Sequence, residues 1–264
     1  MKNIKEKISV VMPAYNEEAR ICASIEETIK TFIDFGCSWE LIVIDDGSTD
    51  STYLRACELV DKYPGRLTVK KNPVNLGKGR ALKKSLRYIS GDYVVFIDAD
   101  MDLHPVQVEA LFDIMRLDNA DIVIGSKLHP NSIVNYPLQR RFISMIYYLL
   151  VKILFNLPCH DTQTGLKLFK AEVLRSVFPR ILVKKFAFDL EVLANAHHLG
   201  YQIAEAPIVL NSQRRYGRIG AGSILTTFWD TLAIFYRMHI VKYYDRIDYH
   251  RRKNMAKEFR RVRR

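Results

Sequence analysis

Short apolar runs alternate with helical patterns through the first half of the chain, and this alternation constrains the fold more than any other feature. The apolar runs have the length of buried strands and lie at 8–12, 41–44, 67–69 and 93–97. The segments between them carry apolar residues at helical spacing, and Gly or Pro residues mark their ends. Strands that alternate with helices predict an α/β fold: a mostly parallel sheet flanked by helices on both faces.

The second half departs from this regular alternation. Three further strands are predicted, at 121–125, 166–169 and 203–210. Three helices are predicted, at 134–157, 186–199 and 224–244, the last with an apolar stripe on one face. No repeat or low-complexity linker interrupts the chain. We therefore expect one α/β domain over residues 1–223, followed by an amphipathic helix and a basic tail over 224–264.

Positive charge is concentrated in the last residues. The 264 residues carry a formal net charge of +11, and residues 237–264 contain eleven Lys or Arg against three Asp or Glu. With 48% hydrophobic residues the chain has a globular composition, which excludes a disordered or fibrous protein. A basic tail predicts an anionic partner, such as lipid headgroups, nucleic acid or an acidic protein. A solvated tail without a partner is the alternative.

The four cysteines are widely spaced and form no C-x-x-C motif. We therefore expect neither a disulfide scaffold nor a zinc site, and a reducing compartment fits this composition. The polar N-terminus predicts no secretory signal. No stretch reaches the roughly 18 uncharged apolar residues of a membrane-spanning helix, so no transmembrane segment is predicted.

Conspicuous side chains, most of them acidic, follow three of the predicted strands. They are Pro13, Tyr15 and Glu17, then Asp45 and Asp46, then Asp98, Asp100 and Asp102. Ligands of an open parallel sheet bind beyond the carboxyl ends of its strands. Three acidic strand ends therefore predict a site for a cation together with an anionic ligand. Each has an ordinary alternative: Tyr15 can be a core residue, and Asp45 or Asp46 can cap a helix.

Asp98 and Asp100 are two residues apart, and in extended backbone such residues point the same way. Two carboxylates on one side can hold Mg²⁺ or Mn²⁺ together with substrate phosphates. Gly77 and Lys78 lie in a glycine-rich turn at a predicted helix start, where backbone N–H groups and the lysine favour an anion. The turn lacks the spacing of a P-loop. A plain tight turn is the alternative.

As an ordered set, these motifs resemble the inverting nucleotide-sugar glycosyltransferases of GT-A (Rossmann-like) fold. The segments that carry the resemblance are PAYNE at 13–17, DDGS at 45–48, GKG at 77–79 and DAD at 98–100. DTQTGLKLF at 161–169 and FAFDLE at 186–191 resemble the branch that glucosylates or mannosylates dolichyl or other polyprenyl phosphates. The resemblance implies hexose transfer with inversion from a nucleotide sugar, with UDP-glucose favoured and GDP-mannose the alternative donor.

The resemblance also implies roles for individual residues. The residues that it implies for binding the nucleotide sugar are Pro13, Tyr15, Glu17, Asp45, Asp46, Gly77, Lys78, Asp98 and Gln163. The resemblance implies that Asp98 and Asp100 bind the metal, Mg²⁺ or Mn²⁺, with Asp102 as a further ligand where the mannosyl branch often has Gln. It implies that Lys127, Arg140, Ser144 and Ser223 bind the acceptor phosphate. The family pattern has a lysine where this chain has Ile224, and Arg214, Arg215 or Arg218 would supply that positive charge. The catalytic set is Asp98, Asp100, Arg140, Asp189 and Glu191.

The implied acceptor explains the chemistry that these residues must perform. A phosphate monoester is already anionic near neutral pH, so it needs a strong general base less than a sugar hydroxyl does. The enzyme must instead bring two anions together. Basic residues position the acceptor, and a metal ion stabilises the leaving diphosphate.

The lipid part of this acceptor gives the apolar stretch 142–155 a role at a membrane surface. A buried core helix is the alternative. The basic tail adds attraction to anionic lipid, so we expect a peripheral protein at the cytoplasmic face of a membrane. A nucleic-acid-binding protein that uses the tail is the rival from another class. It leaves the acidic strand ends unexplained, so we expect no nucleic-acid partner; the oligomeric state is not predicted.

Overall fold

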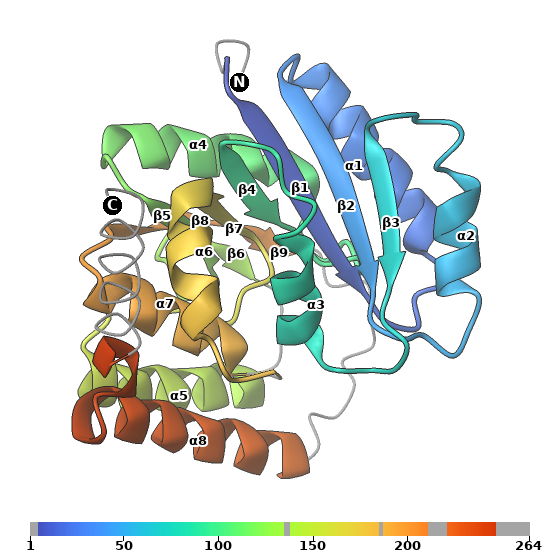
Figure 1. Cartoon of the computed structure of the whole chain (residues 1–264). Coiled ribbons are helices and arrows are strands. Elements are labelled where there is room, and N and C mark those ends of the chain that lie inside the picture. Colours follow the sequence, from blue (N-terminus) through green and yellow to red (C-terminus); the bar gives the residue numbers. More distant parts are fainter. Residues whose placement is uncertain (1–4, 135–137, 185–186, 211–220, 247–264) are drawn as a thin grey trace, which may run out of the picture.

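The structure is a computed structural model that describes residues 5–134, 138–184, 187–210 and 221–246. Within these ranges, the side chains at 138–141, 221, 223 and 224 lie outside the description. The predicted α/β fold is confirmed: helices flank a seven-stranded, mostly parallel sheet (Figure 1).

The first half follows the predicted alternation of strands and helices. Its elements are β1 (Lys7–Ala14), α1 (Ile21–Asp34), β2 (Ser38–Asp45), α2 (Thr52–Glu58), β3 (Leu67–Lys71), α3 (Lys78–Ser85) and β4 (Tyr93–Phe96). β1 pairs in parallel with β2 and β4, and β2 pairs in parallel with β3. α1 shows why these segments form: apolar side chains at helical spacing pack against the sheet, and Gly36 ends the helix at a positive φ.

The second half completes the sheet and adds one strand that runs the other way. Its elements are a 3₁₀ turn (Pro105–Gln107), α4 (Val108–Leu117), β5 (Ile122–Ser126), β6 (Ile133–Val134), α5 (Leu138–Phe155), β7 (Lys167–Lys170), α6 (Ala171–Val177), a 3₁₀ turn (Phe178–Arg180), α7 (Phe188–His198), β8 (Ile203–Pro207), β9 (Val209–Leu210), α8 (Ala221–Phe235) and a π-helical turn (Tyr236–Ile240). The strand order is β3-β2-β1-β4-β7-β5-β8, and β7 is antiparallel to both neighbours.

Two of these elements differ from the predicted ones. The predicted strand at 203–210 divides into β8 and β9 next to Pro207, because proline has no N–H with which to continue a ladder. β9 pairs with β6 in a separate two-stranded sheet. The helix α6 is not among the predicted helices.

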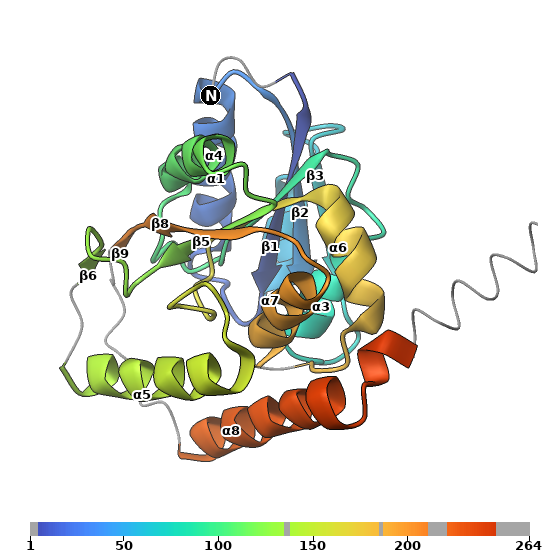
Figure 2. The ribbon, with the colours of Figure 1, turned by 90° about the vertical axis from the view of Figure 1, so that its left-hand side faces the viewer.

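Both faces of the main sheet are buried under helices. Successive strand residues point to opposite faces, so Val10 packs with α1 and α4 while Val11 packs with α3, α6 and α7. Figure 2 shows the two helical layers with the sheet between them. This two-sided burial explains why the strands are continuously apolar.

Helices α5 and α8 lie side by side at one end of the molecule (Figures 1 and 2). The rings of Phe155 and Phe235 pack with centroids 6.1 Å apart, and the Oη of Tyr147 lies 3.3 Å from the Oγ1 of Thr231. The arrowheads of β1 and β2 point toward this same end. The carboxyl edge of the sheet therefore faces the helix pair.

A helix that crosses a bilayer must be both long enough and apolar enough to span its hydrocarbon core. No helix of the described residues, α5 included, meets both requirements for crossing a membrane.

Candidate functional site

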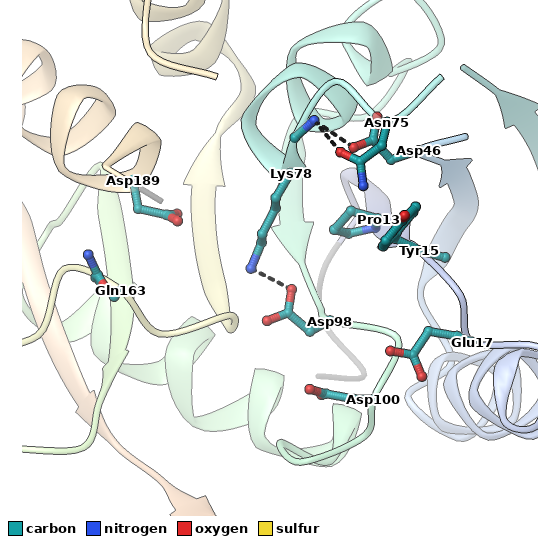
Figure 3. Close-up of a pocket in the computed structure, with 12 residues that line it drawn as sticks. Pro13, Tyr15, Glu17, Asp46, Asn75, Lys78, Asp98, Asp100, Gln163 and Asp189 are labelled. Atoms are coloured by element: carbon teal, nitrogen blue, oxygen red, sulfur yellow. Dashed lines mark hydrogen bonds and ion pairs between the residues drawn. The ribbon is translucent and has the colours of Figure 1, made fainter. Parts of the chain in front are cut away.

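A cavity of about 540 Å³ opens at the carboxyl edge of the sheet, where the sequence predicts the site (Figure 3). Pro13 and Ala14 end β1, Asp46 follows β2, and Asp98 and Asp100 follow β4. The remaining lining residues are Tyr15, Glu17, Asn75, Gly77, Lys78, Gln163 and Asp189. Eight predicted residues from five separate segments are therefore brought together with the acidic pair.

Asp46 organises the loop that leads into α3. Its carboxylate accepts hydrogen bonds from the backbone N–H groups of Leu76 (3.2 Å) and Gly77 (2.7 Å) and from the side-chain amide of Asn72 (2.7 Å). Gly77 has φ +93°, a conformation that glycine adopts without strain. These bonds place Lys78, the first residue of α3, at the wall of the cavity.

Asp45 is predicted to contact the nucleotide, but it lies away from the cavity. Its side chain is fully buried and does not line the cavity. It accepts hydrogen bonds from the backbone N–H (3.2 Å) and hydroxyl of Ser48, and the Nζ of Lys71 lies 3.9 Å away. Asp45 therefore stabilises the turn after β2, which is the alternative that the sequence left open.

Lys78 and Asp98 form an ion pair across the cavity. The Nζ of Lys78 lies 2.5 Å from Oδ1 of Asp98, and each side chain is about one third exposed (34% and 35%). Burial would raise the pKa of Asp98, but the ammonium groups of Lys78, Lys167 and Lys127 together hold that pKa below its usual value. Burial would likewise lower the pKa of Lys78, but Asp98 and Asp189 raise it. Both groups are therefore charged at neutral pH.

The carboxylates after β4 divide between two hollows. Asp98 and Asp100 line the large cavity and also a neighbouring hollow of about 140 Å³, whereas Asp102 lines only the smaller one. Within the described parts of the chain, no three Asp, Glu, His or Cys side chains gather around a common point where a metal could bind. The place of Asp102 in the ligand set therefore stays a prediction. Asp98 and Asp100 by themselves fit Mg²⁺ or Mn²⁺, since these ions use one or two carboxylates plus phosphate and water oxygens.

The loop before β7 forms the opposite wall. Asp161 anchors it by accepting hydrogen bonds from the backbone N–H groups of Lys127 (3.0 Å) and Gln163 (3.1 Å) and from the hydroxyl of Thr164 (2.6 Å). The Nζ of Lys127 lies 3.4 Å from the same carboxylate. This anchor positions Gln163 at the cavity, as predicted.

Gly165 lies directly against the carboxylate of Asp98. A Cβ atom at this glycine would lie 2.0 Å from Oδ2 of Asp98, so even a methyl group would push the carboxylate away. Gly165→Ala is therefore expected to lower turnover by roughly a hundredfold, the typical cost of misplacing a catalytic group by about an ångström. Because the side chain that moves is short and partly exposed, the melting temperature should stay nearly unchanged.

Steady-state turnover and a thermal melt measure these two effects for Gly165→Ala. Gly222→Ala is the matched control, because a Cβ there meets no atom within 4 Å. Wild-type turnover in Gly165→Ala would show that the exact place of the Asp98 carboxylate is unimportant.

Asp189, at the start of α7, is held by a lysine to which the sequence assigned no role. The Nζ of Lys167 lies 2.7 Å from Oδ1 of Asp189 and also donates to the backbone carbonyl of Thr164. Lys167 is buried on β7, whereas Asp189 reaches the cavity. Lys167 thus joins α7 to the loop that carries Gln163.

Glu191 is predicted to belong to the catalytic set, but it lies away from the cavity. It is fully buried, does not line the cavity, and accepts hydrogen bonds from the backbone N–H groups of Leu182 (2.9 Å) and Val183 (2.7 Å). The hydroxyl of Tyr244 and the guanidinium of Arg237 (3.3 Å) also donate to it. Burial, followed by the charge of Glu191, raises the pKa of Tyr244, so its hydroxyl keeps its proton. Glu191 therefore fastens the segment after α8 to α7.

The predicted acceptor residues are only partly covered by the structure. Lys127 lines the smaller hollow, and Ser144 lies half-buried on α5. Arg140 and Ser223 belong to α5 and α8, but their side chains lie outside the description, as do Arg214, Arg215 and Arg218 entirely. These assignments stay predictions.

Tyr147 is a residue that the sequence does not single out. Its hydroxyl lies 3.3 Å from the Oγ1 of Thr231 on α8, and the side chain of Gln163, which lines the cavity, is close enough to affect it. No signal in the sequence distinguishes it from the other aromatic residues of α5. Through Tyr147, the helix pair touches the wall of the cavity.

Comparison with known proteins points to one family. Residues 9–178 match the sequence model described as Glycosyl transferase family 2. A dolichyl-phosphate beta-glucosyltransferase of Trichomonas vaginalis is 31% identical over 90% of this chain and 76% of its own length. Proteins of the same description from Dictyostelium discoideum and Saccharomyces cerevisiae are 32% and 30% identical over 76% of the chain. The chain spans 65% and 66% of those two relatives, just under two thirds.

Solved structures of glucosyl-3-phosphoglycerate synthase from Mycobacterium tuberculosis share the fold. The complex with Mn²⁺, uridine diphosphate and phosphoglyceric acid superposes with a TM-score of 0.67 at 27% identity, covering 88% of this chain and 78% of that one. The complex with Mg²⁺ and uridine diphosphate superposes with a TM-score of 0.64 at 27% identity, covering 86% and 79%.

Proposed function

Because the chain belongs to glycosyl transferase family 2, we propose that it transfers glucose from UDP-glucose to dolichyl phosphate or another polyprenyl phosphate, with inversion at the anomeric carbon. The observation that carries this proposal is the cavity lined by Asp98, Asp100 and Lys78, which opens at the end of the sheet where α5 and α8 lie. The relatives named dolichyl-phosphate beta-glucosyltransferase support the choice of donor and acceptor.

The cavity has separate regions for the parts of a nucleotide sugar. Tyr15, whose ring is 44% exposed, and Glu17 form the rim where the base and ribose would lie. A Mg²⁺ or Mn²⁺ ion held by Asp98 and Asp100 would neutralise the leaving diphosphate. Structural relatives that contain Mn²⁺ or Mg²⁺ with uridine diphosphate support this arrangement.

The far wall of the cavity suits an acceptor that is already anionic. Asp189 faces the space for the sugar, but the ammonium of Lys167 engages its carboxylate. A carboxylate bound in this way is suited to orienting sugar hydroxyl groups rather than to removing a proton. A phosphate monoester needs no proton removed, so this wall favours polyprenyl phosphate over a sugar hydroxyl as nucleophile.

The helix pair provides a surface for the lipid part of this acceptor. Apolar side chains on α5 and α8 and on the π-helical turn are exposed at the end of the molecule to which the cavity opens. They are Phe142, Ile143, Met145, Ile146, Leu149, Ile153, Leu225, Phe228, Trp229, Tyr236 and Ile240. Exposed apolar area of this extent marks an interaction surface, and its aromatic residues suit a lipid interface.

The protein would thus attach peripherally to the cytoplasmic face of a membrane through this surface. The basic tail that was predicted to add attraction to anionic lipid lies outside the described residues. Its contribution stays a prediction.

Replacing Ile146 and Ile153 on α5 by glutamate is expected to reduce binding to lipid vesicles by at least roughly tenfold. Each isoleucine loses about 1.5–3 kcal/mol of burial in the bilayer interface, and the charges add a desolvation penalty. Vesicle flotation measures this change. Leu117→Glu on α4 is the matched control, because its side chain is even more exposed (82%) and helix α4 lies away from the helix pair. Equal flotation of both variants would show that α5 does not contribute to membrane binding.

A panel of labelled nucleotide sugars with a short-chain polyprenyl phosphate tests the reaction itself. We expect UDP-glucose to give a polyprenyl-phosphate glucose, and chelation of divalent metal to stop its formation. Transfer from GDP-mannose and not from UDP-glucose would show that GDP-mannose is the donor. Phosphoglyceric acid, which is present in the Mn²⁺ complex of the structural relative, should be included as a second acceptor. Glucosylation of that acid without any lipid product would overturn the proposed acceptor.

A further inference from the structure

The ammonium group of Lys78 forms an ion pair with the carboxylate of Asp98, one of the two carboxylates proposed to bind the metal ion. Its Nζ lies 2.5 Å from Oδ1 of Asp98 (Figure 3). We propose that Lys78 is an exchangeable counter-ion. It neutralises Asp98 in the empty protein, gives up this carboxylate when metal and nucleotide bind, and then binds the diphosphate. This inference rests on the proposed function, which places metal and diphosphate at this cavity.

The balance of charge in the cavity explains why such an exchange is needed. Five carboxylates line it, those of Glu17, Asp46, Asp98, Asp100 and Asp189. Among the lining residues in the described part of the chain, Lys78 is the only basic one. A nucleoside diphosphate would bring further negative charge into this space. Its binding therefore needs an added cation, and it also needs the existing ammonium to face the phosphates rather than the protein.

Lys78 is the partner that can move. Its four-carbon stem starts at the first residue of α3, and its side chain is one third exposed, so it can turn without disturbing the core. Asp98 has a much shorter side chain than Lys78, and Gly165 lies against one side of its carboxylate, so its range of movement is smaller. When the pair opens, the carboxylate stays in place for a metal ion and the ammonium leaves.

The charges around Lys78 keep it ready for this role. The carboxylates of Asp98, Asp100 and Asp189 line the same cavity as Lys78, and the ion pair with Asp98 is already formed. After leaving Asp98, it needs another anion within reach. The diphosphate would supply one, and a charge-assisted hydrogen bond to a phosphate oxygen would replace the lost ion pair.

The exchange makes metal and nucleotide binding cooperative. Metal alone must displace Lys78 without compensation, whereas metal with nucleotide gives the lysine a new partner. Removing the lysine should therefore have opposite effects on the two ligands: metal alone binds more tightly, and nucleotide in the presence of metal binds more weakly. A lysine with a merely structural role would not produce this reversal of sign.

Mn²⁺ binding to the full chain, followed by electron paramagnetic resonance of the free ion, tests the first effect. Lys78→Met is expected to bind Mn²⁺ alone roughly fivefold more tightly than wild type, the equivalent of a partly exposed ion pair. Calorimetry with UDP at saturating Mn²⁺ tests the second effect. Here the same variant should bind roughly tenfold more weakly, because a charge-assisted hydrogen bond is lost.

Lys127→Met is the control for a general change of charge. Lys127 also acts electrostatically on Asp98, but its ammonium pairs with Asp161. Its loss should change Mn²⁺ affinity less than the loss of Lys78 does. Lys78→Gln provides a second variant if Lys78→Met folds poorly, as judged by its thermal melt.

The outcomes separate this inference from the proposed function. Unchanged or weaker Mn²⁺ binding by both Lys78 variants, with wild type binding Mn²⁺ and UDP normally, would overturn the exchange and leave the proposed function intact. Equal tightening by Lys127→Met would also overturn it, since general charge would then explain the effect. If wild type binds no Mn²⁺ even with UDP, the metal site of the proposed function fails as well.

Discussion

Replacing Asp98 by asparagine is expected to lower sugar transfer by on the order of a thousandfold, at the upper end of what losing one transition-state contact costs. The substitution keeps the shape of the side chain but removes the charge that would hold the metal at the leaving diphosphate. Because Asp98 is one third exposed, the fold should survive. Initial rates with UDP-glucose and polyprenyl phosphate give the effect on transfer, and circular dichroism checks the fold.

Asp34→Asn at the exposed end of α1 is the matched control for Asp98→Asn and should retain wild-type rates. Chelation of divalent metal should reduce the wild type to the level of the Asp98 variant. Chelator-resistant activity, or near-normal rates in Asp98→Asn, would remove the metal from the mechanism.

Glu191→Ala is expected to lower the free energy of unfolding by about 3–5 kcal/mol, the cost of breaking a buried ionic cluster by removing one partner. The substitution leaves the guanidinium of Arg237 without its carboxylate and two backbone N–H groups, of Leu182 and Val183, without an acceptor. Urea unfolding followed by circular dichroism measures the change.

Glu172→Ala, on the exposed face of α6, is the comparison for Glu191→Ala and should cost less than about 1 kcal/mol. If Glu191→Ala kept wild-type stability while losing activity, Glu191 would return to the catalytic set from which its burial removes it.

The acidic motifs show which part of the site could be predicted from sequence. Asp98 and Asp100 follow a strand, where residues two apart point the same way, and both reach the cavity. Asp189 and Glu191 are also two apart, but they lie on α7, where two residues span about 200° of rotation. They therefore point to opposite sides, and only Asp189 reaches the cavity. The helix predicted at 186–199 already separates these two side chains, and only the family resemblance placed Glu191 in the catalytic set.

Adjacent acidic residues follow the same rule. Asp45 is the last residue of β2 and points into the core, whereas Asp46, one residue later, points into the cavity. The sequence left both open because the register of a strand end is not visible in its composition. The structure distinguishes the two residues: Asp45 is buried, and its carboxylate accepts hydrogen bonds from Ser48.

The contacts that sequence could not predict join segments far apart in the chain. Gly165 restrains Asp98 from a distance of 67 positions, and Tyr147 reaches both Gln163 and Thr231. Lys167 reads as an ordinary strand residue until β7 is placed beside α7. Such roles depend on which strands become neighbours, and apolar periodicity carries no information about strand order or direction.

The reversed strand β7 has a consequence for how the protein is made. In the finished sheet it separates β4 from β5, so β4 has no partner on that side until residues 167–170 have been synthesised. A growing chain, which forms its N-terminal part first, therefore carries a bare apolar strand edge for many residues of synthesis. Such an edge invites pairing with other chains. A shortened protein ending near residue 160, made to isolate the nucleotide-binding half, would keep that edge permanently and should aggregate.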